Sequence, residues 1–122
     1  MEYRNEGVLI GGAGGFWGDI TLAPLKMLKD SDLDYLTMDY LAEVTMSIMQ
    51  RQKLKNSKAG YARDFIDLID RILPDILDKN IKVIANAGGV NPNACRDELI
   101  KIASRQNKNI KIGVIEGDDI FK

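Results

Sequence analysis

Short apolar runs alternate along this chain with longer segments in which apolar residues recur every three or four positions. The runs predict four strands, at residues 7–10, 35–38, 81–85 and 110–115. The longer segments predict helices at residues 20–29, 43–55, 61–78 and from residue 91 onward. Because strands and helices alternate, we expect a single α/β domain over residues 1–122, with a Rossmann-like open parallel sheet of about four strands and flanking helices.

Two prolines refine the helix predictions. Pro74 lies inside the strongest helical pattern, so we expect it to kink or locally break that helix. Asn91 and Pro92 are a helix start signal, with the asparagine as cap and the proline at the first helical position. Cys95 falls on the apolar face of the helix that follows, which favours a place in the core.

The predicted sheet is incomplete as a domain. The connection between the second and third strands is long and carries two helices, and the chain stops where a further helix should cover the sheet. Parallel sheets normally have both faces buried. We therefore expect either a part of a larger domain or one half of an assembly, in which a second copy or a partner chain completes the sheet.

Composition narrows the function classes. The 17 basic and 18 acidic residues leave a net charge of −1, which favours neither nucleic acid nor an anionic membrane as partner, and no apolar run approaches the about 20 residues that span a bilayer. The single cysteine excludes an intramolecular disulfide and fits the cytoplasm. The absence of histidine excludes a Ser-His-Asp triad and histidine-based metal sites. Catalysis would need carboxylates, lysine, tyrosine, serine, the thiol or an oxygen-bound metal.

Each predicted strand runs into a loop rich in glycine, carboxylate or amide groups. These loops cover residues 11–19, 39–43, 86–92 and 116–119. In open parallel sheets the loops at the carboxyl ends of the strands meet at one edge, where ligands bind. The sequence therefore predicts a small-molecule site at that edge.

The first loop, GGAGGFWGD, lies between a strand and a helix, the usual setting for phosphate binding. Its spacing, Gly-x-x-Gly-x-x-Gly at Gly12, Gly15 and Gly18, resembles the fingerprint of extended short-chain dehydrogenases and reductases, and Asp39 lies roughly where a ribose-binding acid would be expected. Asp19 and the absence of a Tyr-x-x-x-Lys pair argue against that assignment, and a tight turn without ligand stays open. The candidate cofactor-binding residues are Gly11, Gly12, Gly14, Gly15, Phe16, Trp17, Gly18, Asp19, Gly88 and Gly89. Trp17 is as compatible with the core as with the wall of a ligand site.

Polar side chains in the other loops are the candidates for catalysis: Asp39, Glu43, Asn86, Glu116 and Asp118. We expect Asp39 to lie at the end of a buried strand, where a carboxylate needs a partner, although helix capping would also explain it. Glu43 at a helix start is favourable on electrostatic grounds alone. Glu116, Asp118 and Asp119 suggest either oxygen ligands for Mg²⁺, with Asp39 nearby, or a solvated acidic segment. No metal is identified from these residues.

Taken together, the segments GGAGGFWGD, LDYLTMDYLAEVTM, GYARDF, NAGGVNP and VIEGDD resemble the N-terminal domain of the acyclic terpene utilisation protein A family. The resemblance covers almost the whole chain but only the first part of that domain. It implies a role in bacterial or archaeal breakdown of acyclic terpenes such as citronellol and geraniol, which proceeds through acyl-CoA intermediates. The recurring loop residues of the family, whose roles are not known, correspond here to Gly11, Gly12, Gly14, Phe16, Gly18, Asp19, Asp39, Tyr40, Glu43, Asn86, Gly88, Gly89, Asn91, Glu116, Gly117 and Asp118.

The sequence thus favours a protein that binds or acts on a terpenoid or acyl-CoA-type metabolite. It identifies no cofactor: a CoA-type ligand and Mg²⁺ are both compatible with the loops, and NAD(P) is less favoured. Two alternatives stay open. One is an oxidoreductase-like domain that binds NAD(P), and the other is a non-catalytic subunit that completes its fold with a partner chain. Whether the protein catalyses a reaction is not decided by the sequence.

Overall fold

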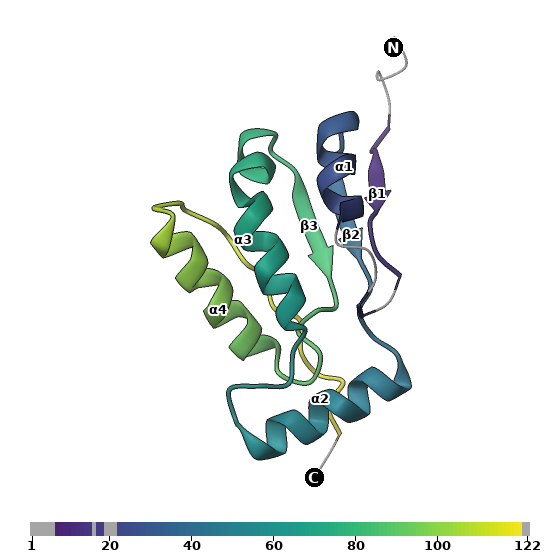
Figure 1. The fold of residues 1–122 in the computed structure, drawn as a ribbon, viewed down its shortest axis with the longest axis vertical. Helices are drawn as coiled ribbons and strands as arrows, with labels where there is room; N and C mark the ends of the chain where they lie inside the picture. The colour runs from purple at the N-terminus through teal and green to yellow at the C-terminus, as the bar shows by residue number, and fades with distance from the viewer. Residues whose placement is uncertain (1–6, 16, 19–21, 121–122) are drawn as a thin grey trace.

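The computed structural model describes residues 7–15, 17–18 and 22–120 (Figure 1). Within them lies one parallel sheet of three strands in the order β1-β2-β3. The strands are β1 (Ile10–Gly12), β2 (Tyr35–Met38) and β3 (Lys82–Ala85). The helices are α1 (Leu22–Asp30), α2 (Glu43–Lys55), α3 (Arg63–Asp78) and α4 (Pro92–Arg105). The predicted α/β class with an open parallel sheet is confirmed.

The predicted fourth strand is wrong, so the described sheet has three strands rather than four. Residues 110–115 show the alternation of half-buried and exposed positions that is typical of a strand, but no ladder pairs them with the sheet. Ile110 packs against the core, and contact along one side of an extended segment is enough to select alternating apolar residues. The alternating apolar positions therefore indicate that one side of this segment packs against the core. A strand needs backbone hydrogen bonds to a neighbouring strand as well.

The first strand lies about three residues later than the apolar run predicted. Ile10 pairs with Tyr35 and Gly12 with Thr37, so the ladder extends into the glycines. Gly11 is buried there, and a Cβ on it would lie 2.8 Å from a methyl carbon of Leu33. Close approach of the strand to that side chain therefore explains a glycine within a strand.

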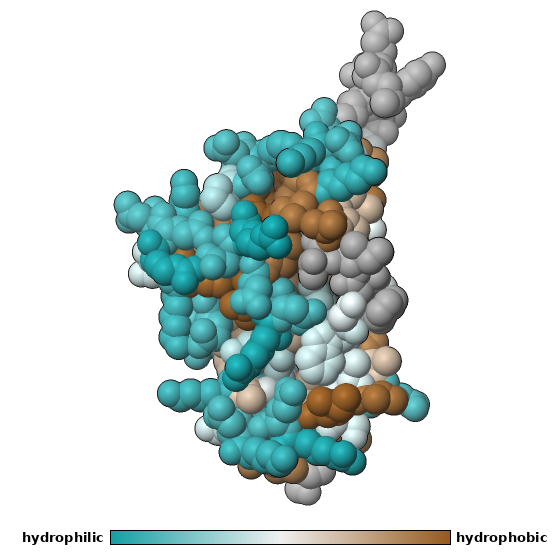
Figure 2. Space-filling view, viewed as in Figure 1, coloured by the Kyte–Doolittle hydropathy of each residue, from teal (hydrophilic) through white to brown (hydrophobic). Residues whose placement is uncertain are grey.

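The two faces of the sheet differ. Leu36 and its register partners Gly11 and Val83 face the helices, and the Leu36 side chain is fully buried. The alternate positions form an open face, on which Ile10 is 59% exposed and Ile84 is 57% exposed. Figure 2 shows the opposite, helix-bearing side, which is mainly hydrophilic. An open apolar face agrees with the expectation of a covering partner, which stays a prediction.

The strand order also bears on the Rossmann-like prediction. The order β1-β2-β3 follows the sequence, and α4 packs on α3. Doubly wound folds bind dinucleotides in the crevice where the strand order reverses. The described strands contain no such reversal, so they give no crevice of that kind, and a Rossmann-like architecture is not confirmed.

Helix starts agree closely with the sequence, but one cap does not. Helices α2 and α4 begin at Glu43 and Pro92 as predicted. Asn91 occupies the cap position of α4, yet its side chain makes no capping bond. Its amide nitrogen instead donates to the carbonyl oxygens of Ser57 (2.9 Å) and Ala59 (2.8 Å). Asn91 therefore joins the start of α4 to the segment that precedes α3.

Helix α3 carries much of the core and continues through Pro74, so the predicted break is wrong. Proline has no N–H, which leaves the carbonyl of Asp70, four residues earlier, without its helical donor. The Gln106 side-chain amide, just after α4, donates to this carbonyl at 2.8 Å and to the Asp70 carboxylate at 2.6 Å. A side chain from the neighbouring helix thus replaces the missing backbone donor.

We expect Gln106→Ala to lower the free energy of unfolding by about 1 kcal/mol, because the Asp70 carbonyl then loses its donor. In a Pro74→Ala background the residue at 74 supplies an N–H, so the same change should be less damaging. Urea unfolding of the four proteins in this double-mutant cycle measures the coupling. Equal losses in both backgrounds would show that Gln106 does not compensate for the proline.

No helix in the described part of the chain combines the length and the apolar character needed to cross a membrane.

Candidate functional site

Two of the predicted site residues are hydrogen-bonded to each other at the carboxyl edge of the sheet. Asp39 follows β2 and Asn86 follows β3, and the Asn86 amide nitrogen donates to Asp39 Oδ1 at 2.6 Å. The Asn86 oxygen accepts the backbone N–H of Tyr40 at 2.7 Å. The Leu41 N–H also donates to Asp39 Oδ1, at 3.1 Å. The amide is therefore oriented by both of its ends, and the loops after β2 and β3 are joined.

The surroundings of Asp39 stabilise its ionised form. Hydrogen bonds from the Asn86 side chain and then the Leu41 N–H lower the pKa of the Asp39 carboxyl below its ordinary value of 3.8. The carboxylate is exposed, so the expectation of a buried acid at this position is wrong. Strand β2 ends at Met38, so Asp39 lies beyond the strand and at the surface. Its hydrogen bond with Asn86 is formed there.

The glycine-rich loop after β1 adjoins this pair. The Asp39 N–H donates to the Gly14 carbonyl at 3.0 Å, and the Ala13 N–H donates to the Thr37 carbonyl at 2.9 Å. Among the described residues, a Cβ added to Gly14 would meet nothing within 4 Å, and one on Gly12 would meet only Thr37 Oγ1 at 3.9 Å. Packing within the described protein thus does not require glycine at these two positions. They leave room for a ligand to approach the backbone.

At other positions of the predicted site, the fold itself explains why the residue is glycine. A Cβ on Gly88 would lie 2.8 Å from Pro92 Cα, and Gly89 has a positive φ of +55°. Gly18 also has a positive φ, +92°, but open space around it. Gly15 is exposed. Phe16 and Asp19 lie outside the described residues, so the predictions for them stay untested.

Trp17 is hydrogen-bonded to the first turn of α3. Its indole N–H donates to Asp64 Oδ1 at 2.7 Å, and its half-buried ring packs against the core. The contact with the core agrees with one of the two alternatives left by the sequence, and a place in the wall of a ligand site stays a prediction.

Neither Tyr40 nor Cys95 is a ready base or nucleophile. The Tyr40 ring is buried edge-on against Phe65, with ring centres 5.7 Å apart, and its hydroxyl donates to the Met38 sulfur. Burial, followed by the nearby Asp64 charge, raises the pKa of Tyr40 to about 12. Burial also raises the pKa of the Cys95 thiol to about 11, which agrees with the predicted core position.

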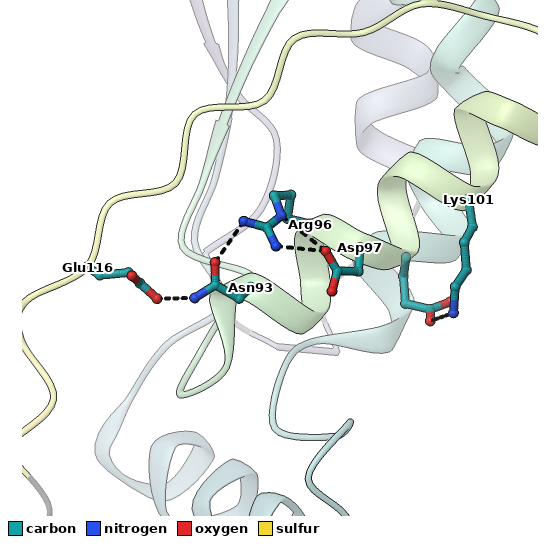
Figure 3. A network of polar contacts seen from close by, with 6 residues as sticks. Asn93, Arg96, Asp97, Lys101 and Glu116 are labelled. Carbon is teal, nitrogen blue, oxygen red and sulfur yellow. Dashed lines mark hydrogen bonds and ion pairs between the residues drawn. The ribbon is translucent and has the colours of Figure 1, made fainter.

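Glu116 belongs to a second polar network, on the first turns of α4 (Figure 3). The Asn93 amide nitrogen donates to Glu116, and Arg96 Nη1 donates to Asn93 Oδ1 at 3.0 Å. Arg96 also pairs with Asp97 at 2.8 Å. These bonds attach the segment after residue 115 to α4.

The remaining predicted acids do not converge. Glu43 is exposed in the first turn of α2, and Asp118 and Asp119 are exposed. Among the described residues, no three histidine, cysteine or acidic side chains gather to hold a metal ion. The described geometry therefore gives no support to a magnesium site at Glu116, Asp118, Asp119 and Asp39.

Sequence reasoning missed Asp64 as the hydrogen-bond partner of Trp17. It lies in the GYARDF segment, and its bond to Trp17 spans 47 positions of sequence. An acidic residue in the first turn of a helix is ordinarily explained by the helix dipole, which hid this role. The available signal was the segment itself, which was noted without an assigned function.

Comparison with families of known proteins finds a match. The model of a family described as acyclic terpene utilisation family protein AtuA matches residues 8–122, most of the chain. No curated protein and no solved structure matches it.

Proposed function

The chain belongs to the acyclic terpene utilisation family, and from that membership we propose that it binds a terpenoid or acyl-CoA-type metabolite at the carboxyl edge of its sheet. The observation that carries this proposal is the oriented pair of Asp39 and Asn86 beside glycine backbone with open space at Gly12 and Gly14. A pathway that uses acyl-CoA intermediates supplies ligands with phosphate and carbonyl groups. The backbone N–H groups of a glycine-rich loop bind phosphate groups, and amide or carboxylate side chains orient the carbonyl end of such a ligand.

The lowered pKa of Asp39 makes it a poor general base, so we assign it a role in binding. A general base works best when its pKa lies near the working pH, and this carboxylate is held well below that. Asp39 therefore acts as a hydrogen-bond acceptor for a hydroxyl or amide of the ligand, and it keeps the Asn86 amide oriented. Whether a chemical step follows binding is left to the activity search that a bound ligand would justify.

An NAD(P)-binding, oxidoreductase-like protein is the less favoured alternative. The described strands lack the reversal of order at which dinucleotides bind, and the sequence lacks a Tyr-x-x-x-Lys pair. The proposal also places the protein in the cytoplasm, which its single, buried cysteine supports.

We expect CoA or a terpenoyl-CoA to raise the melting temperature, because a ligand that binds only the folded state stabilises it by about 2.7 kcal/mol at a hundred times its Kd. Gly14→Ala should leave the melting temperature of the free protein unchanged, since the added Cβ has space. It should weaken CoA binding about tenfold by filling that space. Calorimetric titration of both proteins measures the two affinities.

Gly113→Ala is the matched control, because a Cβ there also meets nothing within 4 Å and the residue lies outside the loops at the carboxyl edge of the sheet. It should bind like the unchanged protein. NAD, NADP and Mg²⁺ are tested separately. Stabilisation by NAD(P) alone would replace the proposal with the oxidoreductase alternative, and no stabilisation by any of them would favour a non-catalytic subunit.

A further inference from the structure

The connection between α2 and α3, together with the first turn of α3, contacts the loops at the ends of all three strands. We call residues 56–65 the bracing segment. Its Ala62 N–H donates to the Ala87 carbonyl at 2.8 Å, and its Gly60 carbonyl accepts the Val90 N–H at 3.0 Å, which fixes the loop after β3. Its Phe65 ring packs edge-on against Tyr40 in the loop after β2.

The bracing segment also contacts the glycine-rich loop, which follows β1. Asp64 Oδ1 accepts the Trp17 indole N–H at 2.7 Å, and both residues are half-buried. Indole is a donor only, and a bond to a carboxylate is stronger than one between neutral groups. Gly18 follows Trp17 and Gly15 lies two residues before it. Glycines give the backbone wide freedom, so a side-chain anchor has a large share in fixing the loop.

We propose that Asp64 is a positioning residue, which holds the glycine-rich loop in its ligand-binding shape through Trp17. The proposal rests on the proposed function, because the shape matters only if this loop receives a ligand. Asp64 acts through Trp17 and does not itself touch the ligand. Its loss should therefore free the indole and weaken binding, while the packing of the sheet and helices stays in place.

The anchor can be tested without any ligand, because Trp17 is the only tryptophan of the chain. In Asp64→Ala we expect acrylamide to quench its fluorescence about twice as efficiently. Asp64→Asn keeps an oxygen that can accept the indole N–H, so quenching should stay near that of the unchanged protein. Asp67→Ala, an exposed acid on the same helix, is the control and should show no change. Unchanged quenching in Asp64→Ala would overturn the proposal.

The consequence for binding is measured by titration with CoA. Affinity should fall at least tenfold in Asp64→Ala and recover in Asp64→Asn. Trp17→Phe removes the donor instead of the acceptor, so it should weaken binding as much, and the double variant should be no worse than either single one. This second route also serves if Asp64→Ala fails to fold.

The two arms separate the possible failures. If quenching of Trp17 increases in Asp64→Ala but the affinity for CoA does not change, Asp64 anchors the loop without positioning it for binding. That result overturns the inference. An unchanged protein that binds no CoA species overturns the proposed function instead. The quenching comparison then decides by itself whether Asp64 holds the loop.

Discussion

Replacing Gly89 with alanine is expected to lower the free energy of unfolding by about 3 kcal/mol. Gly89 has a φ of +55°, a conformation that costs an ordinary residue about 1 kcal/mol or more. The added Cβ would also lie 2.7 Å from the Gly60 carbonyl oxygen and against the Met49 sulfur. Met49 is fully buried and the Gly60 oxygen belongs to the backbone, so relieving the two contacts requires the core and the backbone to shift.

Urea unfolding of Gly89→Ala, with Gly113→Ala as control, measures this effect. The control adds the same methyl group to a backbone with a different φ and with open space, so its stability should change little. A loss below about 1 kcal/mol in Gly89→Ala would mean that the loop after β3 yields easily to the methyl group. The packing of the bracing segment against that loop would then be looser than described.

Changing Asn86 to aspartate should have the second largest effect, and it should depend on pH. The new carboxylate keeps an acceptor for the Tyr40 N–H but removes the donor that now serves Asp39, 2.6 Å away. Two like charges would then adjoin. Because both groups are exposed, solvent screening limits the loss at pH 7 to about 1 to 2 kcal/mol.

The sign of the pH dependence distinguishes the two proteins. In the unchanged protein the folded pKa of Asp39 is lowered, so its contribution to stability is present above 3.8 and is lost as pH falls through the folded pKa. In Asn86→Asp the paired carboxyls bind protons more tightly when folded, so stability should be regained on acidification from pH 7 toward pH 4. Melting temperatures across this range measure it. Asn109→Asp adds the same charge at an exposed position and should show no such recovery.

The sequence pattern predicted helices and strands correctly where the side chains of the element itself determine its bounds. Strand β2 and helix α2 have the predicted bounds, because an apolar run between charged residues and an apolar stripe at helical spacing are local signals. The pairing of residues 110–115 could not be read in this way. Alternating apolar positions record a contact on one side and carry no information about a backbone partner.

The sequence predicted that Asp39 and Asn86 lie at the same edge of the sheet, but it did not predict the hydrogen bonds that they form. Asp39 and Asn86 were placed at one edge because parallel strands share their carboxyl ends. Their mutual bond, and the bond from Trp17 to Asp64, join residues 47 positions apart and depend on how the loops fold. Likewise, Pro74 was expected to kink or locally break α3, and the continuity of the helix was not foreseen because the compensating amide of Gln106 lies outside it.

Bonds between remote segments also set how the site responds to thermal opening. The amide protons of Tyr40 and Ala62 lie near an exposed edge, yet each is held by an acceptor on the loop after β3. Surface loops usually exchange their amide protons with solvent by local fraying. These protons are released only when the loops separate from one another. We therefore expect the carboxyl edge of the sheet to open as one cooperative unit, so that a molecule bound there would slow deuterium uptake in several loops at once.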